Sequence, residues 1–343
     1  MIRIEVLSPA KLNLNLKILN RRPDGYHNIQ TIFQFIDFGD NMTFELTKDR
    51  GVQLISNEKI QKNLILKAAD MIEEKLSQPL NCKITLNKKI PIGSGLGGGS
   101  SNAATTLLIL NHLLHLNYSN DQLSKLGCQL GADVPIFLLG KNALAEGIGE
   151  KLMPIATPEC WFLIVYPRIS VSTNEIFSHS ELTRNSLPSK ISAILKGHSE
   201  NDCQNLVASL YPEISSVLTW LKDQGNPKLT GTGSCIFCQF ETQEKENDSD
   251  ENENDEIDDE ERLAILNDLD SKLKEFYEVC ERSNGPPRKP DEQQKQQQQQ
   301  HNNKKKQKDE KINKFKNKEL QAFVCPITQE VVVDPCTCMD GHT

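Results

Sequence analysis

A glycine-rich stretch, residues 91–104, constrains this chain more than any other part of it, and it reads PIGSGLGGGSSNAA. The alternating run 82–86 before it has the pattern of a strand. Directly after it, apolar residues recur at helical spacing at Ala103, Leu107, Leu110 and Leu114. Glycines in a strand-to-helix turn let the backbone approach a ligand, and a helix N-terminus attracts anions. The stretch therefore predicts a phosphate-binding loop rather than a flexible linker.

Other phosphate-binding loops fit this stretch less well. Residues 93–98 match the dinucleotide fingerprint G-x-G-x-x-G, but Lys88, Lys89 and Pro91 stand where a buried parallel strand would be apolar. No Lys follows the last glycine, as the Walker pattern requires, and no Val-Ala-Ile-Lys strand follows, as in protein kinases. The sequence favours a different class of nucleotide-binding loop.

Charge and composition divide the chain near residue 240. Of 343 residues with a formal net charge of -8, residues 1–240 carry a balance near +2 and residues 241–343 one near -10. The second piece holds an acidic run at 244–261, a glutamine run at 296–300 and a lysine-rich run at 304–318. Such segments bury too little apolar surface to fold. We expect a globular body of two domains, an acidic disordered insert at 243–260 and a low-complexity linker at 284–320.

The setting predicted for the body is cytoplasmic. The ten cysteines of the whole chain are scattered without the spacing of a secreted disulfide framework. The N-terminus begins directly with the strand-like run 2–6, without a recognisable targeting peptide, and no apolar run reaches membrane-spanning length. The predicted partner is a small molecule, with no nucleic acid and no membrane.

Two segments near the N-terminus carry candidate functional groups. Lys11, in PAKLNL, is either a solvated lysine on an amphipathic strand or a functional one. The Pro-Asp-Gly core of 21–27 predicts a turn. That turn presents Tyr26 and His27, whose rings either stack on and hydrogen-bond a base or simply cover a sheet.

Four motifs in order establish a resemblance: PAKLNL at 9–14, DGYH at 24–27, GLGGGSSNAA at 95–104 and LGADVPIF at 130–137, followed by TGTGS at 230–234. Together they resemble the 4-diphosphocytidyl-2-C-methyl-D-erythritol kinases, a family of GHMP kinases, over residues 1 to about 240. The resemblance implies ATP-dependent phosphorylation of the substrate 2-hydroxyl in the non-mevalonate isoprenoid pathway.

The fold implied by the resemblance is α+β with two domains. An N-terminal ATP-binding domain resembling ribosomal protein S5 domain 2 is expected at 1–155. A ferredoxin-like domain is expected at 156–242, and the segment 261–283 is either its displaced closing helix or an unrelated amphipathic helix. Mg²⁺ is the implied cofactor beside ATP, and no protein metal cluster is predicted.

The resemblance also implies roles for matched residues. Asp133 would be the catalytic base and Lys11 its electrostatic partner, since a nearby cation keeps a carboxylate ionised. The expected nucleotide-binding residues are Asn63, Pro91, Gly93, Gly95, Leu96, Gly97, Gly98, Gly99, Ser100 and Ser101. The expected substrate-binding residues are Asn13, Tyr26, His27, Thr173, Gly231 and Thr232.

The end of the chain supports a second function class. The run 323–343 resembles the opening of a U-box, a metal-free relative of the RING fold, while Cys325, Cys336, Cys338 and His342 offer an alternative zinc site. A fragment this short cannot bury a core of its own. A ubiquitin-conjugating enzyme is therefore expected as a partner only of a complete U-box. The alternative function is an impaired kinase body that carries a ubiquitin-pathway interaction tail.

A second cysteine pair, Cys235 and Cys238, has the C-x-x-C spacing of redox and zinc sites. Both cysteines lie in the apolar run 235–240, and no second pair or histidine cluster is near in sequence. The sequence favours two core residues of a strand over a redox or metal site.

Overall fold

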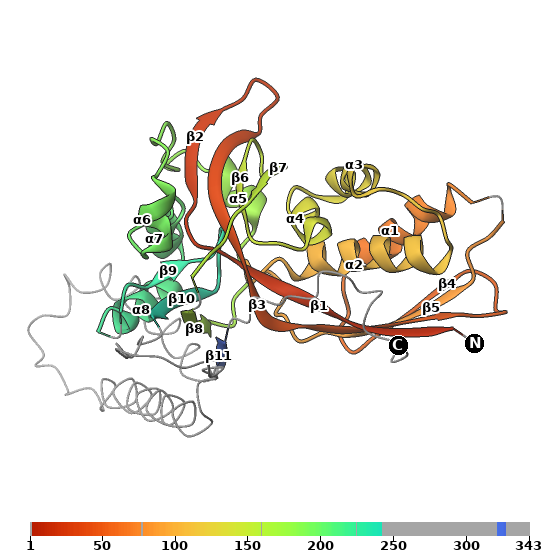
Figure 1. Cartoon of the computed structure of the whole chain (residues 1–343). Coiled ribbons are helices and arrows are strands. Elements are labelled where there is room, and N and C mark those ends of the chain that lie inside the picture. The colour runs from red at the N-terminus through yellow and green to blue at the C-terminus, as the bar shows by residue number, and fades with distance from the viewer. Residues whose placement is uncertain (1, 77, 159, 224, 242–320, 327–343) are drawn as a thin grey trace, which may run out of the picture. The chain divides into compact units, whose positions relative to one another are not determined.

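The computed structural model describes residues 2–76, 78–158, 160–223, 225–241 and 321–326. Residues 2–154 form a first lobe and residues 160–241 a second lobe of one compact unit. The first lobe is built on β3 (His27–Leu46), the long strand seen in Figure 1. This arrangement confirms the α+β class.

Strand β3 pairs with different neighbours along its length. Its first half lies between β2 (Lys17–Arg21) and β6 (Ala143–Glu146), and its second half between β1 (Arg3–Asn13) and β5 (Cys82–Asn87). Strand β4 (Val52–Ser56) runs parallel to β5, and β7 (Lys151–Pro154) runs antiparallel to β6. A register shift between Pro9 and Ala10 interrupts the β1–β3 ladder. Beyond this shift, β1 delivers Lys11 and Asn13 to the middle of the sheet.

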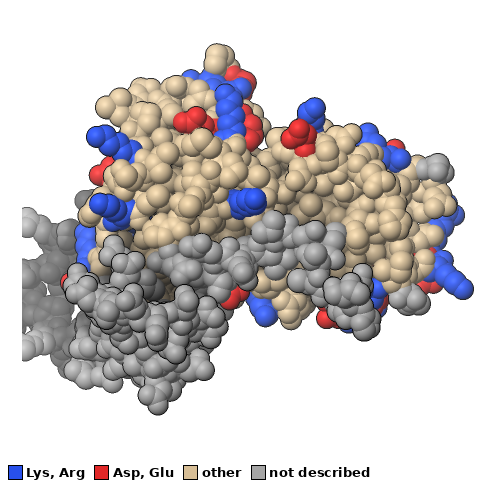
Figure 2. All heavy atoms as spheres, in the orientation of Figure 1, with Lys and Arg blue, Asp and Glu red and all other residues tan. Residues whose placement is uncertain are grey.

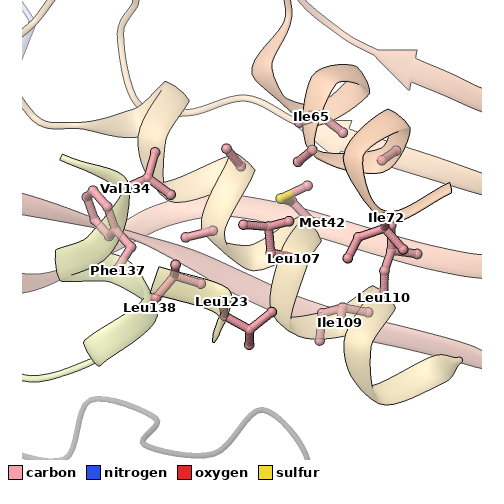
Figure 3. Close-up of a cluster of buried hydrophobic side chains, with 14 of the residues drawn as sticks. Met42, Ile65, Ile72, Leu107, Ile109, Leu110, Leu123, Val134, Phe137 and Leu138 are labelled. Carbon is pink, nitrogen blue, oxygen red and sulfur yellow. The ribbon is translucent and has the colours of Figure 1, made fainter. Parts of the chain in front are cut away.

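Four helices pack on the first lobe, namely α1 (Leu64–Glu73), α2 (Gly98–Leu113), α3 (Asn120–Leu130) and α4 (Val134–Leu139). Helix α1 is amphipathic and buries Ile65, Ala68, Ala69 and Ile72. Helix α2 is buried on nearly every side, because α1, α3, α4 and the sheet all contact it. Figure 3 shows Leu107 and Leu110 of α2 among side chains from α1, β3, α3 and α4. The helix that starts at the glycine loop is thus fixed by the core of this lobe.

In the second lobe, β8 (Cys160–Tyr166), β10 (Ile236–Glu241) and β9 (Lys228–Leu229) lie side by side in that order in one sheet, and β10 runs antiparallel to both of its neighbours. The described part of this lobe also contains the helices α5 (Thr173–Ser178), α6 (Ile191–Leu195), α7 (Gln204–Leu210) and α8 (Pro212–Leu221).

On the face drawn in Figure 2, Lys and Arg side chains are interspersed with Asp and Glu. This mixture accords with the near-neutral balance of residues 1–240.

Two local predictions are confirmed, the strand at 82–86 and the helix after the glycine loop. In the second lobe the helical region from 204 to 221 is divided in two. Helices α7 and α8 are separate, and Tyr211 between them is extended (φ -123°, ψ 96°). Pro212 is the cause, because the residue before a proline is disfavoured in the helical region.

Cys235 and Cys238 are buried in the second lobe, with Cys238 on β10. Burial raises the pKa of Cys238 to about 12, which keeps its thiol protonated and unreactive. The described ranges hold no group of three or more side chains able to ligate a metal. The core-residue interpretation of this pair therefore accounts for both thiols.

Most of the predicted tail lies outside the described residues. This applies to the acidic insert at 243–260, the segment 261–283, the linker at 284–320 and the greater part of the U-box-like run. Within that run the structure describes only the end of β11 (Gln321–Pro326). Among the helices that the model describes, none has the length and apolar character to cross a bilayer.

Candidate active site

The glycine loop alternates into the left-handed region of backbone space. Gly93, Gly95 and Gly97 have φ of +70°, +80° and +77°, a conformation that is costly for residues with a Cβ atom. Gly97 is the N-cap of α2 and provides no side chain to satisfy the first backbone N–H groups. Gly98, Gly99 and Ser100 line the adjoining cavity. The start of α2 therefore presents free N–H donors and the positive end of the helix dipole to a ligand.

The second lobe holds this loop from the other side. The Cys235 N–H donates to the Ser94 carbonyl (2.9 Å), and the Thr230 hydroxyl donates to the Gly95 carbonyl (3.3 Å). A Cβ on Gly95 would lie 2.3 Å from the Thr230 carbonyl oxygen. The conformation of the loop thus depends on glycine for close approach as well as for its backbone angles.

A cavity of about 460 Å³ opens at this loop. Most of the residues expected from the motifs line it: Lys11, Asn13, Asn63, Pro91, Gly93, Gly95, Gly97, Gly98, Gly99, Ser100, Asp133, Thr173, Gly231 and Thr232. Four others do not. Leu96 is fully buried, Ser101 is buried against the Ser8 hydroxyl (2.8 Å), His27 is 6% exposed and Tyr26 is 59% exposed. Leu96 and Ser101 therefore support the loop from behind.

Lys11 is a buried cation, with only 2% of its side chain exposed. Its Nζ donates to Asn13 Oδ1 (2.6 Å) and to the Gly95 carbonyl (2.9 Å), and it lies 3.4 Å from Asp133 Oδ2. The ring centroid of Phe33 is 5.4 Å away. Buried ammonium groups require such partners. Of the two interpretations of the sequence, the structure excludes a solvated lysine.

Asp133 is the N-cap residue of α4, yet its side chain makes no capping hydrogen bond. Its carboxylate is 39% exposed, pairs with Lys11 and faces the cavity. A carboxylate that is partly open to solvent and not occupied in capping is placed to accept a proton from a bound hydroxyl group.

Hydroxyl and amide groups of both lobes meet opposite the loop. Thr173 Oγ1 and Thr232 Oγ1 are 3.0 Å apart, one at the start of α5 and the other in the turn after β9. Asn13 donates its backbone N–H to Thr230 Oγ1 (3.0 Å). Asn201 Nδ2 donates to the Gly231 carbonyl (2.7 Å) and so fixes this turn. This side of the cavity is therefore polar, and its turn is fixed by hydrogen bonds.

His27 and Tyr26 lie at the turn between β2 and β3. The His27 ring is 5.4 Å from that of Phe177, which lines the cavity, and its Nε2 is 3.1 Å from Arg184 Nε. Burial, and then the charges of Arg184 and Arg21, lower the pKa of His27. The two residues therefore differ, since His27 is held in place and Tyr26 is exposed.

Sequence reasoning missed a buried ion pair beneath the loop. Lys88 lines the cavity and its Nζ pairs with the fully buried Asp40. Asp40 also accepts from the backbone N–H groups of Lys89 (2.7 Å) and Ile90 (2.8 Å) and from Asn102 Nδ2 (2.9 Å). Burial lowers the pKa of Lys88, and Asp40 opposes this effect. No local pattern in the sequence marks this pair, because Lys88 and Asp40 are 48 positions apart.

Protein-family models and known relatives match residues of both lobes. Residues 63–141 match the GHMP kinases N terminal domain, and residues 180–254 match the GHMP kinases C terminal domain. The 4-diphosphocytidyl-2-C-methyl-D-erythritol kinase of Pseudomonas fluorescens (strain SBW25) is 52% identical over 236 residues, which cover 68% of this chain and 83% of that relative. Its counterpart in Pseudomonas aeruginosa (strain LESB58) is 49% identical over 242 residues, covering 70% and 86%.

Solved structures extend the comparison to the fold. A crystal structure of 4-(cytidine 5'-diphospho)-2C-methyl-D-erythritol kinase is 34% identical with a TM-score of 0.60, covering 69% of this chain and 89% of that chain. A mevalonate kinase structure, 16% identical with a TM-score of 0.53, shares the fold alone and covers 95% of this chain and 99% of that chain. From these identities and coverages, the chain belongs to the 4-diphosphocytidyl-2-C-methyl-D-erythritol kinase family of GHMP kinases.

Proposed function

We propose that this chain transfers the γ-phosphoryl group of ATP to the 2-hydroxyl of 4-diphosphocytidyl-2-C-methyl-D-erythritol, in the non-mevalonate isoprenoid pathway. The observation that carries the proposal is the Lys11–Asp133 pair (3.4 Å) within a cavity lined by the glycine loop. Phosphoryl transfer to an alcohol requires a base for the hydroxyl proton, a nearby cation and a binding site for the phosphates. This pair beside the start of α2 can supply all three.

In this proposal Asp133 accepts the proton of the attacking hydroxyl. Lys11, with its ammonium 3.4 Å from the carboxylate, stabilises the negative charge of the developing alkoxide. Asn13 and the Gly95 carbonyl hold the ammonium in place through bonds of 2.6 and 2.9 Å. Because these groups are already oriented, little reorganisation is needed when charge develops.

The start of α2 binds the phosphates. Gly98, Gly99 and Ser100 supply unpaired backbone N–H groups at the positive end of a 16-residue helix. Lys88 adds a cation at the same wall of the cavity. Asn63 and Pro91 also line the cavity, on the side where adenine is expected to bind.

Mg²⁺ fits this site as an ion carried with the nucleotide. It favours oxygen ligands and is commonly held by one or two protein groups together with substrate phosphates. Ser100 offers a hydroxyl beside the phosphate-binding glycines, and Asp133 lines the same cavity. Ser100 would hold the ion, which when bound neutralises phosphate charge. Every other part of the proposal depends on the side chains and backbone of this chain.

The opposite side of the cavity receives the cytidine-linked substrate. Thr173 and Thr232 provide hydroxyl groups, and Phe177 provides an aromatic wall that continues into His27. Tyr26, which is exposed beside His27, is available to stack on the base.

The test is ATP consumption by the purified chain with 4-diphosphocytidyl-2-C-methyl-D-erythritol and Mg²⁺. Asp133→Asn removes the base, and Asp70→Asn, an exposed aspartate on α1, serves as the matched control. We expect turnover in the wild type and in the control only. A folded wild-type chain without turnover would contradict the proposal and favour the impaired kinase body with an interaction tail.

A further inference from the structure

Arg184 has no role in the account above, although its guanidinium is fully engaged at the edge of the cavity. Its Nη2 donates to the carbonyls of Phe177 (3.1 Å) and His179 (3.1 Å), and its Nη1 donates to the carbonyl of Leu182 (3.3 Å). The first two acceptors are at the C-terminal end of α5, where carbonyl groups lack helical partners. The third guanidinium nitrogen, Nε, donates its N–H to His27 Nε2 (3.1 Å). Arg184 thus joins the end of α5 to the first residue of β3.

This contact determines where the His27 proton resides. A guanidinium remains protonated in proteins and has only donor groups. Nε2 of His27 must therefore act as the acceptor and carry no hydrogen. A neutral imidazole has one N–H, which is then on Nδ1. Among the hydrogen bonds of the described residues, the one at the His27 ring is made by Nε2, which leaves Nδ1 available to a ligand.

The environment of His27 agrees with a neutral ring. The side chain is 6% exposed and packs against Phe177 at 5.4 Å. Burial of the ring lowers the pKa of His27, and the charges of Arg184 and Arg21 lower it further.

We propose that Arg184 is a positioning residue that fixes His27 as the Nδ1–H tautomer, so that the ring presents a hydrogen-bond donor to the base of the substrate. The inference rests on the proposed function. Cytosine offers acceptors at N3 and O2, whereas N3 of uracil carries a hydrogen. A donor at Nδ1 therefore favours a cytidine substrate and leaves a uridine counterpart with two opposed donors.

Arg184 also orders the wall beside this donor. By binding the carbonyl of Phe177 it fixes the end of α5, from which the Phe177 ring reaches both His27 and the cavity. Loss of the guanidinium should therefore let His27 adopt either tautomer and let the end of α5 move. An exclusively structural role would loosen the wall but would leave the tautomer of His27 unchanged, which separates the two by experiment.

The first test reads the tautomer directly in the full chain. Nitrogen NMR of ¹⁵N-histidine-labelled protein distinguishes Nδ1–H from Nε2–H, and His27→Gln assigns the signals among seven histidines. We expect Nδ1–H in the wild type, a shift toward Nε2–H in Arg184→Met and no shift in Arg3→Met, which removes an exposed arginine. A wild-type ring protonated on Nε2 would overturn the proposal, and this reading of the wild type does not depend on whether Arg184→Met folds.

The second test compares cytidine and uridine forms of the substrate. We expect Arg184→Met to raise KM for the cytidine form by roughly tenfold or more, with kcat changed little, because a hydrogen bond to the base is lost. Preference for cytidine over uridine should fall by a similar factor, and Arg184→Lys, which keeps a charged donor, should recover part of it. An unchanged preference in folded Arg184→Met would overturn the inference alone. A wild type inactive on both forms would instead contradict the proposed function.

Discussion

Asp133 Oδ2 lies 3.4 Å from Lys11 Nζ, and the two side chains come from β1 and from the start of α4. The lysine is almost fully buried, whereas the carboxylate is 39% exposed. The ammonium is therefore fixed by its surroundings, and the carboxylate is the member of the pair that a substrate can reach.

Asp133→Asn should lower kcat by about 10²–10⁴-fold, which is the usual contribution of a general base. The fold should persist, because the Asp133 side chain makes no capping bond that the amide would break. Steady-state kinetics with the cytidine substrate measure the effect, and thermal unfolding verifies the fold. A variant that retains kcat within about threefold would exclude Asp133 as the base.

Gly95→Ala should disrupt the glycine loop. Gly95 has φ of +80°, and an added Cβ would lie 2.3 Å from the Thr230 carbonyl oxygen, so backbone must move. The left-handed conformation alone costs an alanine about 1–2 kcal/mol. Gly140→Ala is the matched control, since Gly140 has φ of +65° with no atom within 4 Å of the added carbon.

Denaturant unfolding of the two variants separates the cost of the left-handed backbone conformation from the cost of the close contact with Thr230. Gly140→Ala should lose only the conformational part, and Gly95→Ala should lose more and also bind ATP weakly. Equal losses in the two variants would mean that the second lobe does not constrain the loop.

The sequence predicted the glycine loop, its preceding strand and its helix because these features depend on residues close together in the chain. Periodicity alone located α2. The Pro212 break between α7 and α8 is also a local signal, because it depends on one proline and the residue before it.

The missed residues depend on long-range pairing. Lys88 and Asp40 are 48 positions apart and Arg184 and His27 are 157 apart, so no local pattern joins them. Lys88 resembles a solvated lysine until β3 and β5 pair and bury it. Of the candidate site, the motifs predicted the groups that face the cavity, whereas the contacts that orient those groups emerged only from the fold.

Asp40→Asn should destabilise the first lobe by about 3–5 kcal/mol, the cost of breaking a buried ion pair. The fully buried Asp40 carboxylate accepts from Lys88, Lys89, Ile90 and Asn102, and an amide replaces one acceptor with a donor. Unfolding by urea measures the loss.

A double-mutant cycle tests whether the charge of Lys88 causes this loss. Lys88→Met in the Asp40→Asn background removes the unpaired cation and should recover part of the stability. Simple additivity of the two substitutions would contradict the assignment of the pair as a coupled unit.

Lys228 should make stability depend on alkaline pH. Its side chain, on β9, is 4% exposed, and Nζ donates to the Gly197 carbonyl (2.7 Å) and to Ser199 Oγ (3.1 Å). Burial lowers the pKa of Lys228 from the ordinary 10.5 to about 8. Between these values the unfolded chain binds the proton and the folded chain does not, so the free energy of unfolding rises with pH. Below pH 8 the cost of burying the charge is fully present.

Lys228→Met should remove the rise in the free energy of unfolding with pH. Urea unfolding of both proteins from pH 7 to pH 10.5 measures the difference. Parallel pH profiles would show that Lys228 stays protonated in the folded protein.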